Sequence, residues 1–232
     1  MELSSHLTHS YPPKWVIEDR QSTTSFAHAA TLAEWETPTV WIIKPEDSCI
    51  VLGNSQREKP FLDISYIESE GLNLTTRCSG GGAVLINPDD LLWVDVFIPK
   101  NSRLWHDDVT QAALWLGEIW VSAMRSISID CSMNTQSLLR SPLTDLVCFA
   151  GKAPGEIFIK GQKIIGISQR RSNKGTRYQC ALALKWNPAH LINAFRNAQI
   201  ENASERIQSC GTGVGCTGDE ALEAFLEQLT TH

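Results

Sequence analysis

The segment from Arg77 to Val84, RCSGGGAV, carries the clearest sign of chemistry because it holds three consecutive glycines. Glycine costs backbone entropy on folding and weakens strands, so such a run is best explained by backbone that must approach something closely. Successive free amides at a glycine-rich bend form a concave site for phosphate or another anion. Arg77 adds a bidentate donor beside it. A flexible turn between two strands is the alternative, but Ser79 and Arg77 favour a binding site.

Lys163 and Cys148 form a second candidate group. Lys163 lies in the apolar run KIIGI after a tight turn, and Gly166 leaves room for a ligand beside its ammonium. The alternative for this lysine is a solvated charge at a sheet edge. Cys148, taken alone, is more typical of a buried structural thiol than of a nucleophile. A nearby ammonium would favour the reactive thiolate, so the interpretation depends on whether the fold brings Lys163 close.

The elements that must position these residues are mostly strands. We predict strands over residues 40–43, 49–52, 72–76, 83–86, 91–98, 156–160, 163–168 and 178–184. Helices are predicted over residues 22–36, 60–71, 107–126, 188–197 and 219–229, from apolar periodicity and from Pro and Gly at their ends. A turn is expected at residues 87–90, and a hairpin about Gly161-Gln162 with a type II′ turn. Because strands come in neighbouring pairs, we predict an α+β fold with a mixed, largely antiparallel sheet and packed helices.

Length and composition exclude several classes of protein. The chain of 232 residues is 42% hydrophobic and fits one domain over residues 1–232, with a core at about 22–197 and a C-terminal helix at about 219–229. A net charge of −6 argues against binding to nucleic acid or to an anionic membrane. The first ten residues do not resemble a secretory signal, and no apolar run could span a bilayer. Seven scattered cysteines suit a reducing cytoplasm, and Cys210 with Cys216 is too weak a pattern to predict a metal.

Two motifs together resemble those of the lipoate–protein ligase family. Residues 76–84, TRCSGGGAV, resemble the family's RRxSGGGAV signature, and residues 161–169, GQKIIGISQ, resemble its GxKxxGxxx segment. They occur in the family's order and separation, and the flanking elements match from about residue 22 to 197. The resemblance implies the catalytic-domain fold that biotin and lipoate protein ligases share. The GRGRRGR loop of biotin ligases is absent, which sets biotin aside.

The resemblance also implies roles for individual residues. Lys163 becomes the central catalytic cation, which binds the acyl carbonyl or the phosphate beside it. This role agrees with the negative charge that acyl transfer builds on a carbonyl oxygen. The pocket for the acyl group or its adenylate would be formed by Arg77, Ser79, Gly80, Gly81, Gly82, Ala83, Gly166, Ser168 and Gln179.

Two mechanisms are compatible with this family. A ligase would use ATP with Mg and free lipoate to form an acyl-adenylate, with no need of a cysteine. An octanoyltransferase would take the acyl group from octanoyl-acyl carrier protein onto a cysteine, and pass it to a lysine of a lipoyl-domain carrier such as glycine cleavage H protein or 2-oxoacid dehydrogenase E2. Octanoyltransferases that look like lipoate ligases have Cys-Phe fifteen residues before the lysine and Glu eight residues after the cysteine, as Cys148-Phe149 and Glu156 stand here. The missing Asn-Asp before the lysine and the missing extra C-terminal domain of many ligases also favour the transferase, with no permanently bound cofactor.

Departures from the family pattern support a second alternative, a non-catalytic acyl-binding relative. Thr76 replaces the first arginine of the signature, which weakens the case for phosphate binding. Cys180-Ala181 replace the family's His-Gly after Gln179, and this removes an imidazole that could position the acyl group. Cys180 becomes a second candidate nucleophile, although a small core residue is the simpler interpretation.

Overall fold

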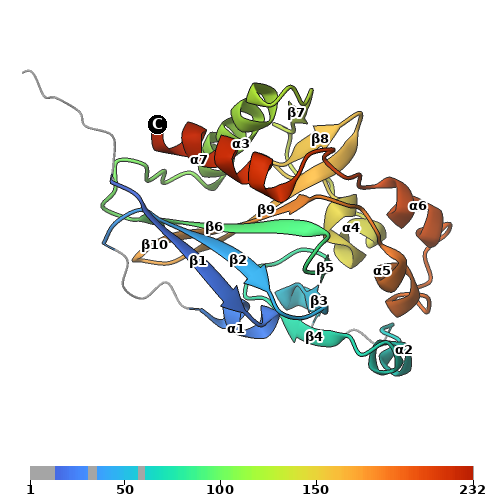
Figure 1. Cartoon of the computed structure of the whole chain (residues 1–232). Helices are drawn as coiled ribbons and strands as arrows, with labels where there is room; N and C mark the ends of the chain where they lie inside the picture. The colour runs from blue at the N-terminus through green and yellow to red at the C-terminus, as the bar shows by residue number, and fades with distance from the viewer. Residues whose placement is uncertain (1–13, 31–35, 57–60, 232) are drawn as a thin grey trace, which may run out of the picture.

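The computed structural model describes residues 14–30, 36–56 and 61–231 of the chain. Its main element is a seven-stranded sheet, in which β1 pairs parallel to β2 and the remaining neighbours are antiparallel (Figure 1). In spatial order the strands are β1 (Val16–Ser22), β2 (Thr39–Pro45), β6 (Leu91–Pro99), β10 (Gly175–Ala183), β9 (Gln162–Arg171), β8 (Ile157–Ile159) and β7 (Ser132–Met133). The predicted α+β class with a largely antiparallel sheet is confirmed.

A second, three-stranded sheet packs against one face of the large sheet (Figure 1). Its strands, in spatial order, are β4 (Asn73–Thr76), β3 (Cys49–Leu52) and β5 (Val84–Ile86). All four residues of β3 are buried, because this strand is covered on both faces. The glycine bend connects β4 to β5 and therefore lies beside the interface between the two sheets.

Helices cover the remaining surfaces. Two long helices, α3 (Val109–Ser126) and α7 (Gly218–Thr231), pack on the face of the large sheet opposite the small sheet, with the rings of Trp120 and Phe225 stacked at 4.0 Å (Figure 1). The shorter helices are α1 (Thr24–Ala29), α2 (Ile64–Ser69), α4 (Pro142–Leu146), α5 (Ala189–Ala194) and α6 (Ala203–Ser209), with 3₁₀ turns η1 (Asn54–Gln56) and η2 (Cys148–Ala150). In the part of the chain that the structure describes, no helix combines the length and apolarity needed to cross a membrane.

The first predicted helix is much shorter than expected. It runs from Thr24 to Ala29, Ala30 is extended, and Glu36 lies in a bend, while residues 31–35 are outside the described residues. The cause is a long-range contact, because the guanidinium of Arg177 donates to the carbonyl oxygens of Ala27 and Ala30. These bonds satisfy carbonyl groups that a longer helix would have used internally.

Two other predicted boundaries were wrong. Helix α2 begins at Ile64 rather than at residue 60, because the Asp63 side chain caps it by accepting from the Tyr66 amide at 2.8 Å. Pro60 lies outside the described residues. The hairpin between β8 and β9 turns at Lys160-Gly161, since Gln162 already pairs with Ile159. Both turn residues have positive φ, +48° and +85°, so the turn is type I′ rather than II′.

The strands β1 and β7, the helices α4 and α6, and the 3₁₀ turns η1 and η2 were not predicted. The other strands and the helices α3, α5 and α7 lie within two or three residues of their predicted bounds. The structure confirms the turn at residues 87–90, where the Asp90 amide donates to the Asn87 carbonyl oxygen.

Candidate active site

A mostly apolar cavity lies between the two sheets, with a volume of about 460 Å³ that includes space open to solvent. Five of the predicted site residues line it: Arg77, Cys148, Gly166, Ser168 and Gln179. The other walls are formed by His28, Val51, Val84, Ile86, Trp93, Phe149, Ile167, Cys180 and Ala181. Such a cavity, apolar with a few convergent polar groups, suits a small ligand with a long apolar part.

The glycine bend is docked directly on the segment that carries Cys148. A Cβ added at Gly82 would stand 2.6 Å from the backbone N and C atoms of Val147 and 2.8 Å from the amide nitrogen of Cys148. The Ala83 amide donates to the Leu146 carbonyl oxygen at 2.8 Å, and the Cys148 amide donates to the Ala83 carbonyl oxygen at 2.9 Å. Glycine is therefore required at position 82 by close backbone approach.

Arg77 holds the bend in shape from within. Its side chain is buried, and Nη2 donates to the carbonyl oxygens of Gly80 at 2.9 Å and Gly82 at 2.8 Å. Nε donates to Ser79 Oγ at 3.0 Å, and Ser79 Oγ lies 3.3 Å from Ser168 Oγ on β9. The sequence predicts Arg77 as a donor aimed at the ligand. In the structure these donors bind the loop itself, while the side chain forms part of the cavity wall.

Lys163 is fully buried and points at the Cys148 segment. Its Nζ donates to Glu156 Oε2 at 2.7 Å and to the backbone carbonyl oxygen of Cys148 at 2.9 Å. The rings of Phe149 and Phe158 lie 5.6 and 5.9 Å from Nζ. The alternative of a solvated edge charge is therefore wrong, because the side chain is only 1% exposed.

Glu156 neutralises this ammonium from behind. Burial raises the pKa of Glu156, and the positive charge of Lys163 opposes that shift. The carboxylate also accepts from the Ala153 amide at 2.7 Å, so its position is fixed by more than the lysine. Neither Lys163 nor Glu156 lines the cavity, but the pair fixes an ammonium against the backbone carbonyl of Cys148, which does line it.

Cys148 differs from the other candidate cysteine of the cavity wall. It is half-buried, at the start of the 3₁₀ turn η2. Cys180 is fully buried, and burial raises its pKa to about 12, which keeps it a thiol. Burial also raises the pKa of Cys210 to about 12. The structure thus favours Cys148 as the thiol that a ligand in the cavity can reach.

His28 was missed by the sequence analysis. It comes from α1, its ring centroid lies 4.7 Å from that of Trp93, and its Nδ1 is 3.1 Å from Gln179 Nε2. Burial, together with the charges of Arg177 and Arg77, lowers the pKa of His28 to about 3, so the ring is neutral. No local pattern marks this histidine, because its partner Gln179 stands 151 residues later.

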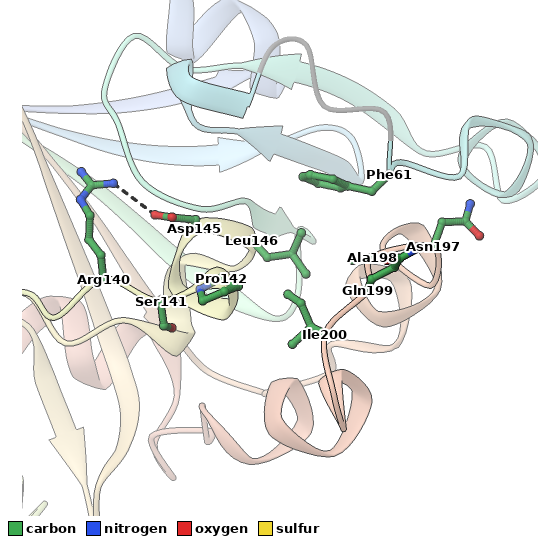
Figure 2. A pocket seen from close by; sticks show the side chains of 10 residues that line it. All are labelled: Phe61, Arg140, Ser141, Pro142, Asp145, Leu146, Asn197, Ala198, Gln199 and Ile200. Carbon is green, nitrogen blue, oxygen red and sulfur yellow. Dashed lines mark hydrogen bonds and ion pairs between the residues drawn. The ribbon is translucent and has the colours of Figure 1, made fainter.

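A larger and more open groove lies elsewhere on the molecule, with a volume of about 1240 Å³ that includes open solvent. Figure 2 shows its walls, which come from Phe61, from the region of α4 and from residues 197–200. Arg140 and Asp145 form an ion pair at 3.1 Å in this groove, and both side chains are exposed. None of the predicted site residues lines this groove, so size alone does not identify the site.

The two-sheet fold and the glycine bend define a catalytic domain of the lipoate–protein ligase class. The family model of the lipoyl protein ligase A/B catalytic domain matches residues 21–230, and the chain belongs to this family.

The individual relatives share less than 30% sequence identity with this chain. The chain is 23% identical over 188 residues to octanoyltransferase LipM of Lysinibacillus sphaericus, covering 76% of this chain and 67% of that protein. It is 29% identical over 199 residues to octanoyl-[GcvH]:protein N-octanoyltransferase of Oceanobacillus iheyensis, covering 80% and 66%. The chain thus spans about two thirds of the length of these relatives. A bipartite lipoate protein ligase of Thermoplasma acidophilum, solved in a study that included its E2 lipoyl domain, shares the fold with a TM-score of 0.71 at 14% identity, over 96% of this chain and 84% of that one.

Proposed function

We propose that this chain is an acyltransferase of protein lipoylation, which carries an octanoyl or lipoyl group as a thioester on Cys148 and transfers it to a lysine of a carrier protein. The observation that carries the proposal is the position of Cys148, at the wall of an apolar cavity and with its backbone carbonyl oxygen bound by the buried Lys163. The relatives named as octanoyltransferases support the same reaction class. A ligase that works through an adenylate needs no thiol at this position.

The first half-reaction is a thioester exchange. The thiolate of Cys148 attacks the acyl carbonyl of the donor, a new C–S bond forms, the donor's C–S bond breaks, and the donor leaves as a thiolate, which takes up the proton that Cys148 released. Negative charge develops on the carbonyl oxygen, and the proposed group that stabilises it is the ammonium of Lys163, which is held 2.9 Å from the backbone carbonyl oxygen of Cys148. Glu156 keeps the ammonium oriented, as a positioning residue.

The second half-reaction regenerates the thiol. The neutral amine of a carrier lysine attacks the Cys148 thioester, a C–N bond forms, the C–S bond breaks, and the amine proton is transferred to the departing thiolate. The acyl chain stays in the cavity, against Arg77, Ser168, Gln179 and the space left by Gly166. Ser79, Gly80, Gly81, Gly82 and Ala83 act by holding the wall that contacts Cys148.

Donor and acceptor are carrier proteins in this proposal. Acyl carrier protein is the proposed donor, and a lipoyl-domain protein such as glycine cleavage H protein or E2 the proposed acceptor. The name of the Oceanobacillus relative makes octanoyl-GcvH a second donor to test. A reducing cytoplasm suits the reaction, since all seven cysteines are free.

Intact-mass measurement after mixing the protein with octanoyl-acyl carrier protein, without ATP, tests the proposal directly. We expect an octanoyl adduct on Cys148, which Cys148→Ser should lose, with transfer falling roughly 10³-fold or more. Cys216→Ser is the matched control, because Cys216 lies away from the cavity and should keep the adduct. Octanoyl-GcvH is the second donor in the same assay.

Two outcomes contradict the proposal. Acylation of a lipoyl domain that appears only with ATP and free lipoate, and that survives Cys148→Ser, would make the chain a ligase. Tight acyl binding without transfer from any donor would make it a non-catalytic acyl-binding relative.

A further inference from the structure

His28, one of the residues that line the cavity, has a ring nitrogen without a hydrogen-bond partner among the described residues. The residue lines the cavity and is 8% exposed, and its Nε2 is buried without a hydrogen-bond partner among the described residues. A buried polar atom that stays unpaired costs free energy, so such an atom in a cavity wall indicates that something else satisfies it. The mechanism proposed above makes no use of this nitrogen.

The contacts around His28 determine which of its two ring nitrogens carries the proton. Gln179 hydrogen-bonds the carboxylate of Asp95, which can only accept while it is paired with Arg177. The amide nitrogen of Gln179 must therefore face both Asp95 and His28, and it donates its second N–H to His28 Nδ1. A neutral imidazole that accepts at Nδ1 carries its proton at Nε2. The free atom is consequently a donor.

His28 packs on β6 of the large sheet, whereas the ring of Phe149, next to Cys148, packs on β9. Gly166, Ala181 and Trp93 are side by side across β9, β10 and β6. The Lys163 side chain passes 3.9 Å from the position of a Gly166 Cβ, whereas His28 packs at Trp93. The backbones of Gly166 and Trp93 are therefore two strand spacings apart, roughly 10 Å. An extended eight-carbon acyl chain spans a comparable distance.

We propose that His28 binds the dithiolane ring at the far end of a lipoyl chain, and that the cavity consequently binds lipoyl groups more tightly than octanoyl groups. The inference rests on the proposed function, because it takes the acyl carbonyl to lie at Cys148 and Lys163. A dithiolane sulfur accepts a hydrogen bond, though weakly, and the terminal methyl of an octanoyl chain accepts none. The ring of Trp93 beside His28 adds a favourable surface for sulfur.

The proposed preference for lipoyl groups can be tested by the binding of two neutral probes, so the test does not require acyl transfer. The dissociation constants of lipoamide and octanamide are measured by calorimetry on the full chain, its His28→Phe variant and its His28→Asn variant. We expect lipoamide to bind the unchanged protein more tightly, and His28→Phe to reduce that preference roughly 5-fold or more. His28→Asn keeps an N–H donor and should retain part of the preference.

Ile86→Val is the control, because it trims an apolar part of the same wall and should weaken both probes alike. Equal affinities in the unchanged protein, tighter octanamide binding, or a preference that persists in a folded His28→Phe variant would each overturn the inference. If His28→Phe does not fold, the His28→Asn variant and the unchanged protein still decide it. Failure of the proposed function would instead appear as absent acyl transfer, whichever probe binds better.

Discussion

Lys163 and Glu156 bury opposite charges against each other behind the cavity. Removing two charges from water costs several kcal/mol per ion, and only good geometry with further hydrogen bonds offsets that cost. Here the Cys148 carbonyl and the Ala153 amide supply those further bonds. A buried ion pair is weak evidence for stability, so the arrangement is better explained by the position it gives the ammonium.

Lys163→Ala should reduce acyl transfer roughly 10²-fold or more, because the carbonyl oxygen loses its preorganised cation. It also leaves Glu156 buried without a partner, so the free energy of unfolding should fall by about 3–5 kcal/mol. Transfer rates and urea unfolding measure the two effects separately.

The double variant Lys163→Met with Glu156→Gln separates chemistry from folding. It removes both charges, and so should recover much of the lost stability while transfer stays low. Recovery of transfer together with stability would show that Lys163 is structural and not catalytic.

Two close approaches fix the glycine bend between β4 and β5. A Cβ at Gly53 would stand 1.8 Å from the carbonyl oxygen of Gly81, and a Cβ at Gly82 would meet the Val147 backbone at 2.6 Å. The bend is therefore packed between the end of β3 and the segment that leads into η2. Of the three glycines in the bend, Gly82 serves this backbone packing, which positions Cys148.

Gly82→Ala should destabilise the protein by roughly 1–3 kcal/mol, because the new methyl group overlaps backbone and not a movable side chain. We also expect slower formation of the acyl-enzyme, since relief of the overlap displaces Cys148. Thermal unfolding and intact mass check both effects. Gly80→Ala is the comparison for stability, because a Cβ there meets nothing within 4 Å. Equal melting temperatures for the two variants would contradict this account of the bend.

At the scale of the whole molecule, the N-terminal helix reaches the cavity through contacts made by β10. Arg177 pairs with Asp95 of β6 and donates to the carbonyl oxygens of Ala27 and Ala30, which ties α1 to the large sheet. This attachment buries His28 in its neutral form. The opposite face of the sheet, covered by α3 and α7, contributes core packing, and it meets the cavity at Cys180 and Ile167.

The buried neutral His28 should make stability depend on pH. Its pKa is lowered by burial and by Arg177 and Arg77, from 6.5 to about 3. Between these values the unfolded chain binds a proton that the folded protein does not, so this contribution is complete above pH 6.5 and is lost as the pH falls toward 3. The slope is about 1.4 kcal/mol per pH unit within that window.

Urea unfolding of the unchanged protein and of His28→Phe between pH 7.5 and 4 measures the contribution of His28 to the pH dependence of stability. Carboxylates titrate in both proteins, so the difference between the two slopes belongs to the histidine. Stability should fall less steeply with acid in the variant. Parallel curves would mean that His28 is not buried as a neutral ring.

The sequence by itself determined the described strands other than β1 and β7, the long helix α3, the turn at residues 87–90 and the motifs around Arg77, Cys148 and Lys163. These features depend on neighbouring residues, through apolar periodicity, turn preferences and spacing along one segment. The family membership, which the family model confirms, rests on the same local patterns.

Only the tertiary structure decided how α1 ends, what Arg77 holds, and that His28 joins Gln179 in the cavity wall. Each of the outcomes at α1 and His28 depends on partners about 150 residues apart, Arg177 with Ala30 and Gln179 with His28. The donors of Arg77 are close in sequence to their acceptors, but the folded bend had to turn the carbonyls of Gly80 and Gly82 inward before they could meet. Side-chain hydrogen bonds of this kind have no period along the chain, because they form where the sheet brings distant backbone and side-chain atoms together.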